Sequence, residues 1–349
     1  MNKFAINGQN IGDSYSPYII SEISANHNGS IQNAKDLIMQ AKKNGTSAVK
    51  LQTYTPDSIT INSDHSNFIV DHGAWKGRKL YELYEEAHTP YEWHEELFNY
   101  AKELEITIFS SPFDRSAVEL LEKLDTPAYK IASFEIVDID LIRLCASTRK
   151  PLIISTGMAN IEEIEEAFNE AIKFGSGEIS LLYCISGYPT PLKEFNLLNI
   201  TDMKKRFNCP VGLSDHTIGN IAAYCATALG SNILEKHITL NKDGGGPDDF
   251  FSMEPSDLKE LSINLEDIHK SIKEVSYDLT ESETENRKYR RSLYYIKDIE
   301  KGDILTKDSI KSARPAFGIP PKYSKSIVGK ILRKGVKKYD GVNLEDFSE

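Results

Sequence analysis

The stretch PLIISTGMANIEEIEEAFNEAIKFGSGEISLLYC, residues 151–184, holds a buried strand, an amphipathic helix and a second buried strand in succession. Its two apolar runs, PLIIS and ISLLYC, are short and rich in Ile and Leu, which is typical of strands covered on both faces. The helix between them, Ile161–Phe174, is followed by Gly175, a common helix stop. Strand, helix and strand in one run predict a parallel sheet with crossover helices.

The same alternation extends in both directions along the chain. Six further apolar runs are predicted strands: Tyr18–Ile23, Ser47–Gln52, Ile106–Ser110, Ala128–Ile131, Pro210–Leu213 and Asn232–His237. Helical patterns separate or follow them: Ile31–Asn44, Tyr91–Leu104, Ala117–Leu124, Gly219–Ala228 and Pro255–Val275. Eight such units are the content of a closed (β/α)8 TIM barrel, which typically has about 250 residues. A doubly wound open sheet is the structural alternative.

The pattern changes after the barrel. Residues 1–278 are predicted to form the catalytic barrel, and the polar segment 279–290 is predicted to be a linker or an exposed helix. Short apolar runs between glycines then predict a compact, β-rich module over residues 291–349.

The composition excludes several classes of function. The net charge of −11 argues against binding to nucleic acid or to an anionic membrane surface. No run approaches the roughly 20 apolar residues of a membrane span, and the N-terminus has no apolar signal segment. Four cysteines without C-x-x-C spacing fit reduced thiols. We therefore expect a cytoplasmic protein.

Polar residues gather where the predicted strands end. Chemistry in a TIM barrel takes place at the carboxyl ends of the strands, on one face. The residues at these ends include Glu22, Gln52, Ser110, Ser111, Ser133, Glu135, Ser155, Ser186, Tyr188, Ser214 and Asp215. Their convergence predicts an active site at this mouth.

Two histidines suggest a metal site. His216 follows the seventh strand and His237 ends the eighth, and neighbouring strands lie about 4.8 Å apart. Two imidazoles at that separation can share a divalent ion and leave positions open for substrate. Asp215 could ligate or orient, and Asp248 lies in a glycine-rich loop that could approach the ion. The alternative is a pair of structural histidines at the rim.

Two lysines suggest an anion site. Lys50 and Lys130 lie inside apolar strands, where an unpaired ammonium is costly, so each must face a carboxylate or a ligand. Pairing with Glu22 or Glu135 is the structural alternative. Together with the serines at the strand ends, they could cradle phosphate and carboxylate groups. A Schiff base on Lys130 or Lys236, as in a class I aldolase, stays open.

These motifs together resemble the sialic acid synthase family. The resemblance rests on EISANHNG at 22–29, VKLQT at 49–53, SSPF at 110–113, AYKIASFE at 128–135, STGM at 155–158, YPT at 188–190, GLSDHT at 212–217 and EKH at 235–237. The C-terminal part, with Arg314-Pro315, resembles the antifreeze-like (SAF) domain of those synthases. QTYTPD at 52–57 and LYELY at 80–84 are most similar to the pseudaminic acid synthases in that family, rather than to N-acetylneuraminate or legionaminic acid synthases.

The resemblance implies a transferase that condenses phosphoenolpyruvate with an amino-sugar aldehyde, 2,4-diacetamido-2,4,6-trideoxy-L-altrose, and releases phosphate. It implies that His216 and His237 bind Mn²⁺ or Mg²⁺, and that Glu22 and Glu135 handle protons or water. It also implies phosphoenolpyruvate binding by Lys50, Lys130, Ser133, Ser155, Ser186 and Ser214. Ser111, Tyr188 and Asp248 are expected substrate-binding residues, and Gln52 is expected beside the metal and sugar. Arg314 is expected to reach the sugar from the other subunit of a domain-swapped homodimer.

Two positions depart from the family pattern. Many relatives have Ser-Thr-Pro-Phe where this chain has Ser110-Ser111-Pro112-Phe113, and Ser186 replaces an Asn that is frequent in neuraminate synthases. The second departure weakens the role of Ser186 and fits a different sugar. A non-enzymatic sugar sensor built on the same barrel is the remaining hypothesis, and it predicts ligand binding without phosphate release.

Overall fold

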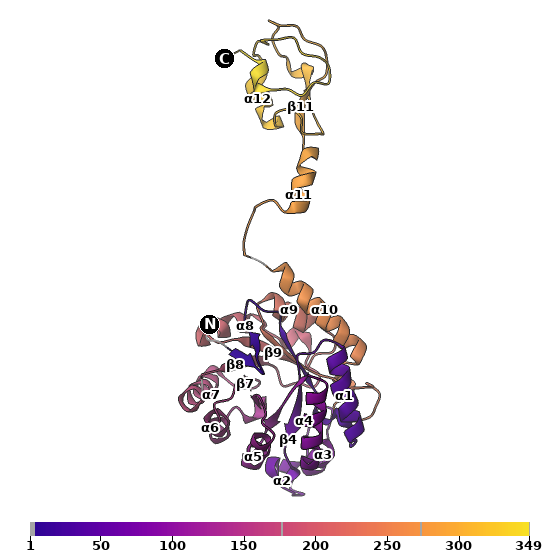
Figure 1. Ribbon diagram of the computed structural model, residues 1–349, viewed down its shortest axis with the longest axis vertical. Helices are drawn as coiled ribbons and strands as arrows, with labels where there is room; N and C mark the ends of the chain where they lie inside the picture. The colour runs from indigo at the N-terminus through magenta and orange to yellow at the C-terminus, as the bar shows by residue number, and fades with distance from the viewer. Residues whose placement is uncertain (1–3, 176, 273, 349) are drawn as a thin grey trace. The chain divides into compact units, whose positions relative to one another are not determined.

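The computed structural model describes residues 4–175, 177–272 and 274–348. The chain divides into two compact units, residues 1–273 and 274–349. In the first unit, eight parallel strands close into a barrel in the order β10-β3-β4-β5-β6-β7-β8-β9. The predicted TIM barrel is therefore confirmed. Figure 1 shows the strands at the centre of this unit with helices around them.

The strands follow the predicted apolar runs closely. Their bounds are β3 Tyr18–Glu22, β4 Ala48–Thr53, β5 Thr107–Pro112, β6 Tyr129–Ile131, β7 Leu152–Ser155, β8 Ile179–Cys184, β9 Val211–Asp215 and β10 Ile233–His237. Gly212 lets β9 approach its neighbours, since a Cβ there would lie 2.4 Å from the Ile233 carbonyl oxygen.

The helices pack their apolar faces on the outside of the barrel. They are α1 Ile31–Lys43, α4 His94–Glu103, α5 Arg115–Lys123, α6 Ile139–Ser147, α7 Ile161–Phe174, α8 Leu198–Phe207, α9 Ile221–Ala228 and α10 Pro255–Ser271. Side chains hydrogen-bond to the first turns of several, as with Asn160 and Glu163 in a reciprocal capping box at the start of α7. No helix within the described ranges is long and apolar enough to cross a membrane.

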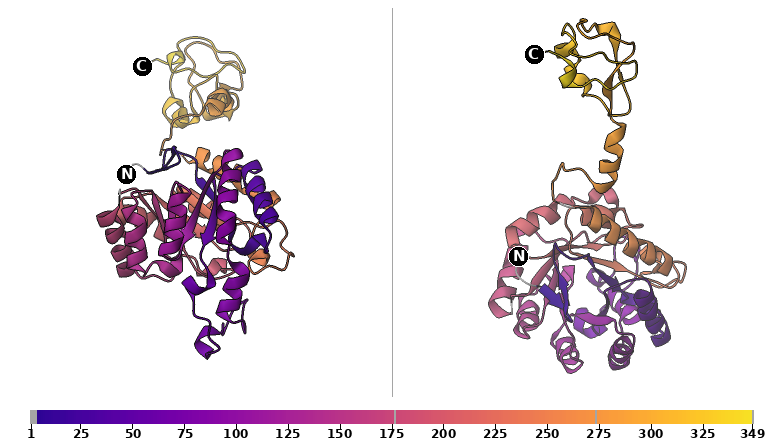
Figure 2. Two further views of the ribbon diagram at one scale, coloured as in Figure 1. Left: turned by 60° about the horizontal axis from the view of Figure 1, so that its bottom comes forward. Right: turned by 45° about the horizontal axis from the view of Figure 1, so that its top comes forward.

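The connection between β4 and α4 carries extra structure at the mouth end. It contains α2 Pro56–Ile59, a 3₁₀ turn at Ser66–Phe68, α3 Leu80–Ala87 and a 3₁₀ turn at Tyr91–Trp93. In the left view of Figure 2 this purple segment extends from the end of the barrel opposite the N-terminus. It therefore reaches the same end as the carboxyl termini of the strands.

A hairpin closes the other end of the barrel. β1 Phe4–Ile6 pairs antiparallel with β2 Gln9–Ile11. Its residues Phe4, Ile6 and Ile11 join one buried cluster with Tyr18, Ile20, Ala48, Phe109, Ala128, Ile153, Leu182 and Ile233 from the barrel interior. The hairpin therefore works as an apolar plug at the amino-terminal end of the strands.

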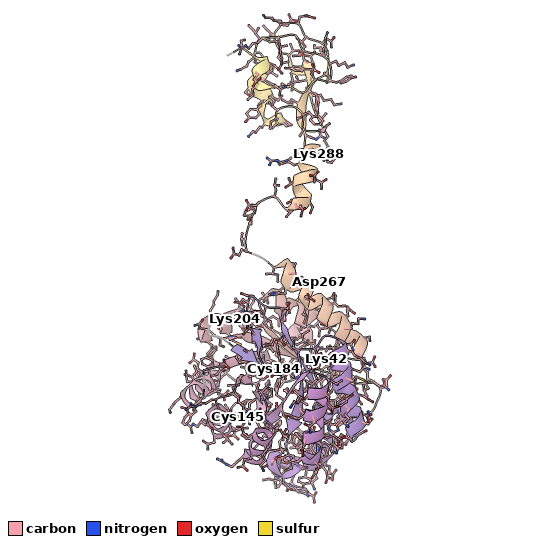
Figure 3. All side chains as sticks on the ribbon, in the orientation of Figure 1. Lys42, Cys145, Cys184, Lys204, Asp267 and Lys288 are labelled. Atoms are coloured by element: carbon pink, nitrogen blue, oxygen red, sulfur yellow. The ribbon has the colours of Figure 1, made fainter. Side chains whose placement is uncertain are left out.

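The four cysteines are free thiols. Cys145 of α6 and Cys184 of β8 are labelled in Figure 3 and lie on different elements. Cys145, Cys184 and Cys209 are buried, and Cys225 is exposed.

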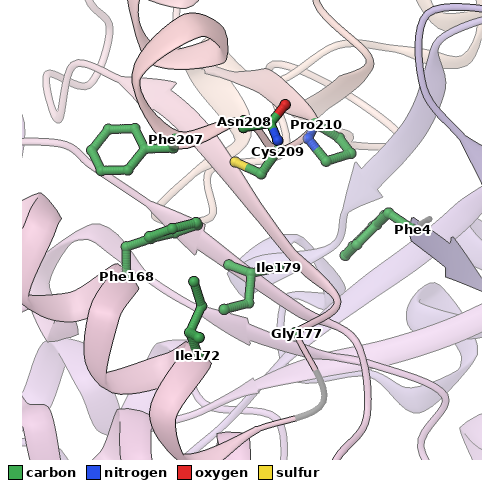
Figure 4. Close-up of a pocket in the computed structure, with 9 residues that line it drawn as sticks. All are labelled: Phe4, Phe168, Ile172, Gly177, Ile179, Phe207, Asn208, Cys209 and Pro210. Carbon is green, nitrogen blue, oxygen red and sulfur yellow. The ribbon is translucent and has the colours of Figure 1, made fainter. Parts of the chain in front are cut away.

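A small cavity lies near the plugged end. Phe4, Phe168, Ile179, Phe207 and Cys209 are among its lining residues (Figure 4). Its volume of about 60 Å³ is far below the roughly 300 Å³ at which ligand pockets begin. We therefore do not place the active site there.

The second unit has its own small core. β11 Ser292–Tyr295 pairs antiparallel with β12 Ile310–Ala313, and α12 Ser324–Ile327 follows. Buried residues such as Leu293, Tyr295, Leu305, Leu332 and Val342 form its apolar cluster. A short helix, α11 Glu281–Asn286, lies within the segment predicted to be a linker or an exposed helix.

Candidate active site

The strand register brings charged side chains together inside the mouth. Glu22 of β3 lies beside both Lys50 of β4 and His237 of β10. Glu235 lies two residues before His237 on the same strand, beside Ser214 of β9. Because successive side chains of a strand alternate, Glu235 and His237 share the inner face, whereas Lys236 faces the surrounding helices.

Two lysines and two glutamates form a buried cluster. Lys50 makes an ion pair with Glu22, and its Nζ lies 3.7 Å from Glu235 Oε1. The Nζ of Lys130 lies 3.7 Å from the same oxygen. All four residues are at most 5% exposed. Glu235 was not among the predicted site residues, yet it is the carboxylate that both lysines approach.

This cluster divides protons unevenly between its carboxylates. Burial raises the pKa of Glu22 to about 7, with Lys50 opposing the shift and Glu235 adding to it. Burial would raise the pKa of Glu235 as well, but Lys130 and Lys50 outweigh it and hold that pKa below its ordinary value. Burial also lowers the pKa of Lys130. Near neutral pH, Glu235 is therefore ionised, whereas Glu22, with a pKa of about 7, is partly protonated.

Glu135 is a second carboxyl with a raised pKa. It ends a 3₁₀ turn, Ser133–Glu135, that follows β6. Burial raises its pKa to about 7, and the charge of Lys130 limits the shift. Its Oε2 is buried and has no hydrogen-bond partner among the described residues.

Serine hydroxyls surround the lysines. Lys50 donates to Ser111 Oγ at 3.2 Å, and Lys130 donates to Ser155 Oγ at 2.6 Å. Ser214 donates to Glu235 Oε1 at 3.2 Å. Ser110, in contrast, bonds Thr53 and takes no part in this set.

A glycine keeps open the space between two other serines. The backbone N–H of Gly157 donates to Ser133 Oγ at 3.2 Å. A Cβ at position 157 would lie 2.7 Å from Ser133 Oγ and 2.3 Å from Ser186 Oγ. Hydroxyls and a backbone amide beside an ammonium are groups that bind phosphate and carboxylate oxygens.

The two predicted metal ligands lie next to each other. The ring centroids of His216 and His237 are 5.5 Å apart with the planes at 65°. His216 Nδ1 lies 3.1 Å from the Ile185 carbonyl oxygen. Since a carbonyl only accepts, this bond puts the proton on Nδ1 and leaves Nε2 free to bind a cation.

His237 also fits a metal ligand. Its Nδ1 is buried without a hydrogen-bond partner among the described residues and lies 3.8 Å from Asp248 Oδ2. Burial and neighbouring positive charge lower its pKa well below the ordinary value, so the ring is neutral. Within the described ranges, no group of three or more His, Cys, Asp and Glu is placed to hold an ion. The pair of imidazoles, which would share an ion with water and substrate, fits the predicted divalent metal.

Gln52 and Asp248 are linked through Ser24. Gln52 Nε2 donates to Glu22 Oε1 at 3.2 Å and to Ser24 Oγ at 3.1 Å. Ser24 Oγ in turn donates to Asp248 Oδ2 at 2.5 Å. The chain of contacts runs from the lysine cluster through Gln52 to the loop beside His237.

Aromatic rings wall the mouth on the histidine side. The ring centroid of Tyr188 lies 4.4 Å from that of His216, 5.5 Å from that of Phe251 and 5.7 Å from that of Trp75. Trp75, on the β4–α4 connection, donates its Nε1–H to the Pro247 carbonyl oxygen at 3.0 Å. This contact ties the connection to the loop that carries Asp248.

Asp215 and Lys236 lie behind the site. Lys236 Nζ is 2.7 Å from both Asp215 Oδ2 and the Thr217 carbonyl oxygen. Asp215 Oδ1 accepts the backbone N–H of Thr217 at 2.9 Å. Asp215 therefore shapes the turn that carries His216, and Lys236 is engaged outside the mouth.

Arg314 belongs to the second unit, directly after β12. Its predicted contact with the sugar stays a prediction.

Comparison with known families agrees with this geometry. Residues 37–277 match the model of the NeuB family, and residues 290–346 match the SAF domain. The first match covers most of the barrel, and the second covers the compact C-terminal core.

Individual relatives cover almost the whole chain. It is 43% identical to the pseudaminic acid synthase of Campylobacter jejuni over 95% of this chain and 96% of that protein. It is 42% identical to the pseudaminic acid synthase of Helicobacter pylori over 95% and 97%. Identity to an N,N'-diacetyllegionaminic acid synthase of C. jejuni is 36% over 91% and 96%. Among solved structures, an N-acetylneuraminic acid synthetase from Leptospira borgpetersenii matches with a TM-score of 0.73 and 27% identity, covering 82% of this chain and 95% of that one.

Proposed function

The chain belongs to the NeuB family, and on that premise we propose that it is a pseudaminic acid synthase. It would condense phosphoenolpyruvate with 2,4-diacetamido-2,4,6-trideoxy-L-altrose and release phosphate. The observation that carries the proposal is the higher identity to pseudaminic acid synthases than to the legionaminic acid synthase, at nearly full coverage. An N-acetylneuraminate or legionaminic acid synthase is the alternative within the family.

Phosphoenolpyruvate would bind at the buried lysines. Lys50 pairs with Glu22 and shares Glu235 with Lys130, and Glu235 Oε1 lies 3.7 Å from each Nζ. An anionic ligand would complete their neutralisation. The serine hydroxyls and the Gly157 backbone N–H would donate hydrogen bonds to its oxygens and would fix the direction of its C3.

His216 and His237 would hold a divalent cation such as Mn²⁺ or Mg²⁺. When bound, the ion supplies a Lewis acid for the aldehyde oxygen of the acceptor. The hydrogen bond from His216 Nδ1 to the Ile185 carbonyl oxygen orients the ring, and Nε2 would be the nitrogen that binds the ion.

The two carboxyls with raised pKa divide the proton transfers. The C3 of phosphoenolpyruvate would form a bond to the aldehyde carbon, and the aldehyde oxygen would take a proton, for which Glu22, with its pKa of about 7, is the proposed donor. A water oxygen then bonds to C2 and gives its proton to Glu135, whose Oε2 is unpartnered among the described residues. The bond from C2 to the bridging oxygen then breaks while the new C2 hydroxyl becomes the keto group. The hydroxyl proton goes to the departing phosphate, whose charge the lysine cradle stabilises.

The assembly is part of the proposal. We infer a catalytic domain at 1–278, a linker at 279–290 and a SAF domain at 291–349. The enzyme would work in the cytoplasm as a domain-swapped homodimer in which Arg314 reaches the partner's sugar. What supports this is the resemblance to the synthases and the match to the SAF domain.

A phosphate-release assay tests the function. The chain is incubated with phosphoenolpyruvate, Mn²⁺ and one of three acceptors: the diacetamido altrose sugar, or the acceptor of the neuraminate or of the legionaminic acid synthases. We expect phosphate release and a nine-carbon keto acid of the correct mass with the first sugar. Faster turnover with another acceptor would assign the chain to that alternative.

A further inference from the structure

Ser24 stands in an unusual backbone conformation at the edge of the site. It follows β3 and begins a buried 3₁₀ turn, Ser24–His27. Its φ is 47°, in the left-handed region. Residues with a Cβ avoid that region because of steric repulsion, whereas glycine enters it freely. The side chain is buried, with 5% exposure.

The hydroxyl of Ser24 uses its donor and one acceptor site for two residues of the mouth. It donates to Asp248 Oδ2 at 2.5 Å and accepts from Gln52 Nε2 at 3.1 Å. Glycine would relieve the backbone but would remove both bonds. The backbone strain at Ser24 is therefore offset by the two hydrogen bonds of its hydroxyl, one with Gln52 and one with Asp248.

These bonds decide which atoms the two partners offer to a ligand. Both amide hydrogens of Gln52 are directed at protein oxygens, Glu22 Oε1 and Ser24 Oγ. The amide oxygen of Gln52 is then its remaining polar atom. Asp248 Oδ2 accepts from Ser24 Oγ, and the carboxylate also accepts from the backbone N–H of Ala25. Because a carboxylate has about four lone-pair sites, Asp248 keeps acceptor capacity at Oδ1. Both remaining atoms are acceptors, so the pair matches a ligand that presents two donors.

We propose that Ser24 is a positioning residue for the acceptor sugar, holding Gln52 Oε1 and Asp248 Oδ1 as a matched pair of acceptors. The inference rests on the proposed function, because the donors would be a hydroxyl and an acetamido N–H of the amino sugar. Loss of the hydroxyl lets the Gln52 amide rotate and removes one of the bonds that orient the Asp248 carboxylate. The anion site at Lys50 and Lys130 keeps its own contacts.

The test compares Ser24→Gly with Ser24→Ala. The glycine variant removes both the hydroxyl and the strain, whereas the alanine variant removes only the hydroxyl. The probe is the alditol made by reducing the acceptor, which cannot react, titrated calorimetrically in the presence of phosphoenolpyruvate and Mn²⁺. We expect its Kd to rise about tenfold or more in both variants, the effect of losing a hydrogen bond to a charged group. The Kd of phosphoenolpyruvate should change by less than about twofold, and Ser24→Gly should melt at a higher temperature than Ser24→Ala.

Asn208→Gly is the matched control. Asn208 has a φ of 48° at the end of α8, on the plugged side of the barrel. The Asn208→Gly variant should gain stability, because glycine adopts this backbone conformation without strain, and it should keep native affinity for the alditol. An unchanged alditol Kd in Ser24→Gly overturns the proposal. So does a loss of affinity that appears only in the less stable alanine variant, because that would be a packing effect.

Wild-type turnover is measured in the same samples. If the wild-type chain releases no phosphate with the diacetamido sugar, the proposed function is wrong. If it turns over and Ser24→Gly binds the alditol normally, only the role of Ser24 is refuted.

Discussion

Lys130 Nζ lies 3.7 Å from Glu235 Oε1, the same oxygen that lies 3.7 Å from Lys50 Nζ. One carboxylate therefore serves as the shared counter-ion of two buried ammonium groups. Lys50 also pairs with Glu22, so Lys130 is the ammonium that depends more on Glu235. This difference determines how the site should respond to mutation.

Glu235→Gln should destabilise the free enzyme. Removing one partner from a buried ionic cluster leaves uncompensated charge, which costs about 3–5 kcal/mol. We expect a loss of this order in the free energy of unfolding, measured with urea. Because the lysines are then short of negative charge, phosphoenolpyruvate should raise the melting temperature of the variant more than that of the wild type. A variant as stable as the wild type, with an equal ligand shift, would contradict the shared role.

Glu135→Gln should remove a proton acceptor from the reaction. General base catalysis contributes about 10²–10⁴-fold, and we expect a fall in kcat of that size. In the wild type, kcat should rise as the pH approaches about 7, where Glu135 loses its proton, and fall at higher pH, where Glu22 loses the proton that it supplies. The variant should lack the rising limb. Steady-state phosphate release between pH 5.5 and pH 8.5 would measure both.

The buried carboxyls of Glu22 and Glu135 should make the free energy of unfolding depend on pH. Their pKa values rise from 4.5 to about 7 on folding, so in that window the folded protein binds more protons than the unfolded chain. The free energy of unfolding should therefore fall as pH increases from 4.5 to 7. Glu135→Gln should remove its part of this fall, roughly 3 kcal/mol between pH 4.5 and pH 7. A wild-type slope of opposite sign over this window would show that the carboxyls are not buried as described.

His237→Ala should separate metal binding from folding. The ring makes no hydrogen bond through Nδ1 to the described residues, so its loss should cost little stability beyond the lost packing. Mutating a residue that only hydrogen-bonds to a metal ligand lowers metal affinity by roughly 10–100-fold. Loss of His237, a predicted ligand, should lower Mn²⁺ affinity by more than this. Calorimetric Mn²⁺ titration reports this without turnover. Chelator should inactivate the wild type, and added Mn²⁺ should restore it. Native Mn²⁺ affinity in the variant would remove His237 from the site.

Gly157→Ala should block the anion cradle. The added Cβ would lie 2.3 Å from Ser186 Oγ and 2.7 Å from Ser133 Oγ, so both hydroxyls must move. Overpacking of this kind costs about 1–3 kcal/mol, and we expect the KM for phosphoenolpyruvate to rise more than the KM for the sugar. Gly335→Ala is the control, since its Cβ would meet nothing closer than 3.7 Å. Equal effects on both KM values would place Gly157 outside the phosphoenolpyruvate site.

Much of the barrel follows from local pattern. The apolar runs and the helix stops predict β3 to β10, because a strand that is buried on both faces consists mostly of apolar residues. The positions of Lys50, Lys130, His216 and His237 at one mouth follow from the same strand assignment. Asn7-Gly8, both with positive φ, is a hairpin signal that could have revealed β1 and β2.

The partners of these residues do not follow from local pattern. Glu235 meets the lysines because the ring closes β10 against β3, and which carboxylate an ammonium approaches depends on that register. Lys236, the next residue in the chain, points out of the mouth and makes an ion pair with Asp215. The structure therefore does not support a Schiff base at Lys236. Ser24 was visible as a strand-end polar residue, but the left-handed turn that aims its hydroxyl depends on tertiary contacts with Asp248.

The apolar plug of Phe4, Ile6 and Ile11 closes one end of the barrel, so ligands can enter only from the other end. A ligand bound at Lys50 and Lys130, which lie on strands, is deeper in the barrel than a ligand bound at Asp248, which lies in a loop. A sugar already seated at the rim would obstruct the path to the floor, so phosphoenolpyruvate must load first. Initial-rate kinetics should accordingly show a compulsory order, with the sugar arriving last.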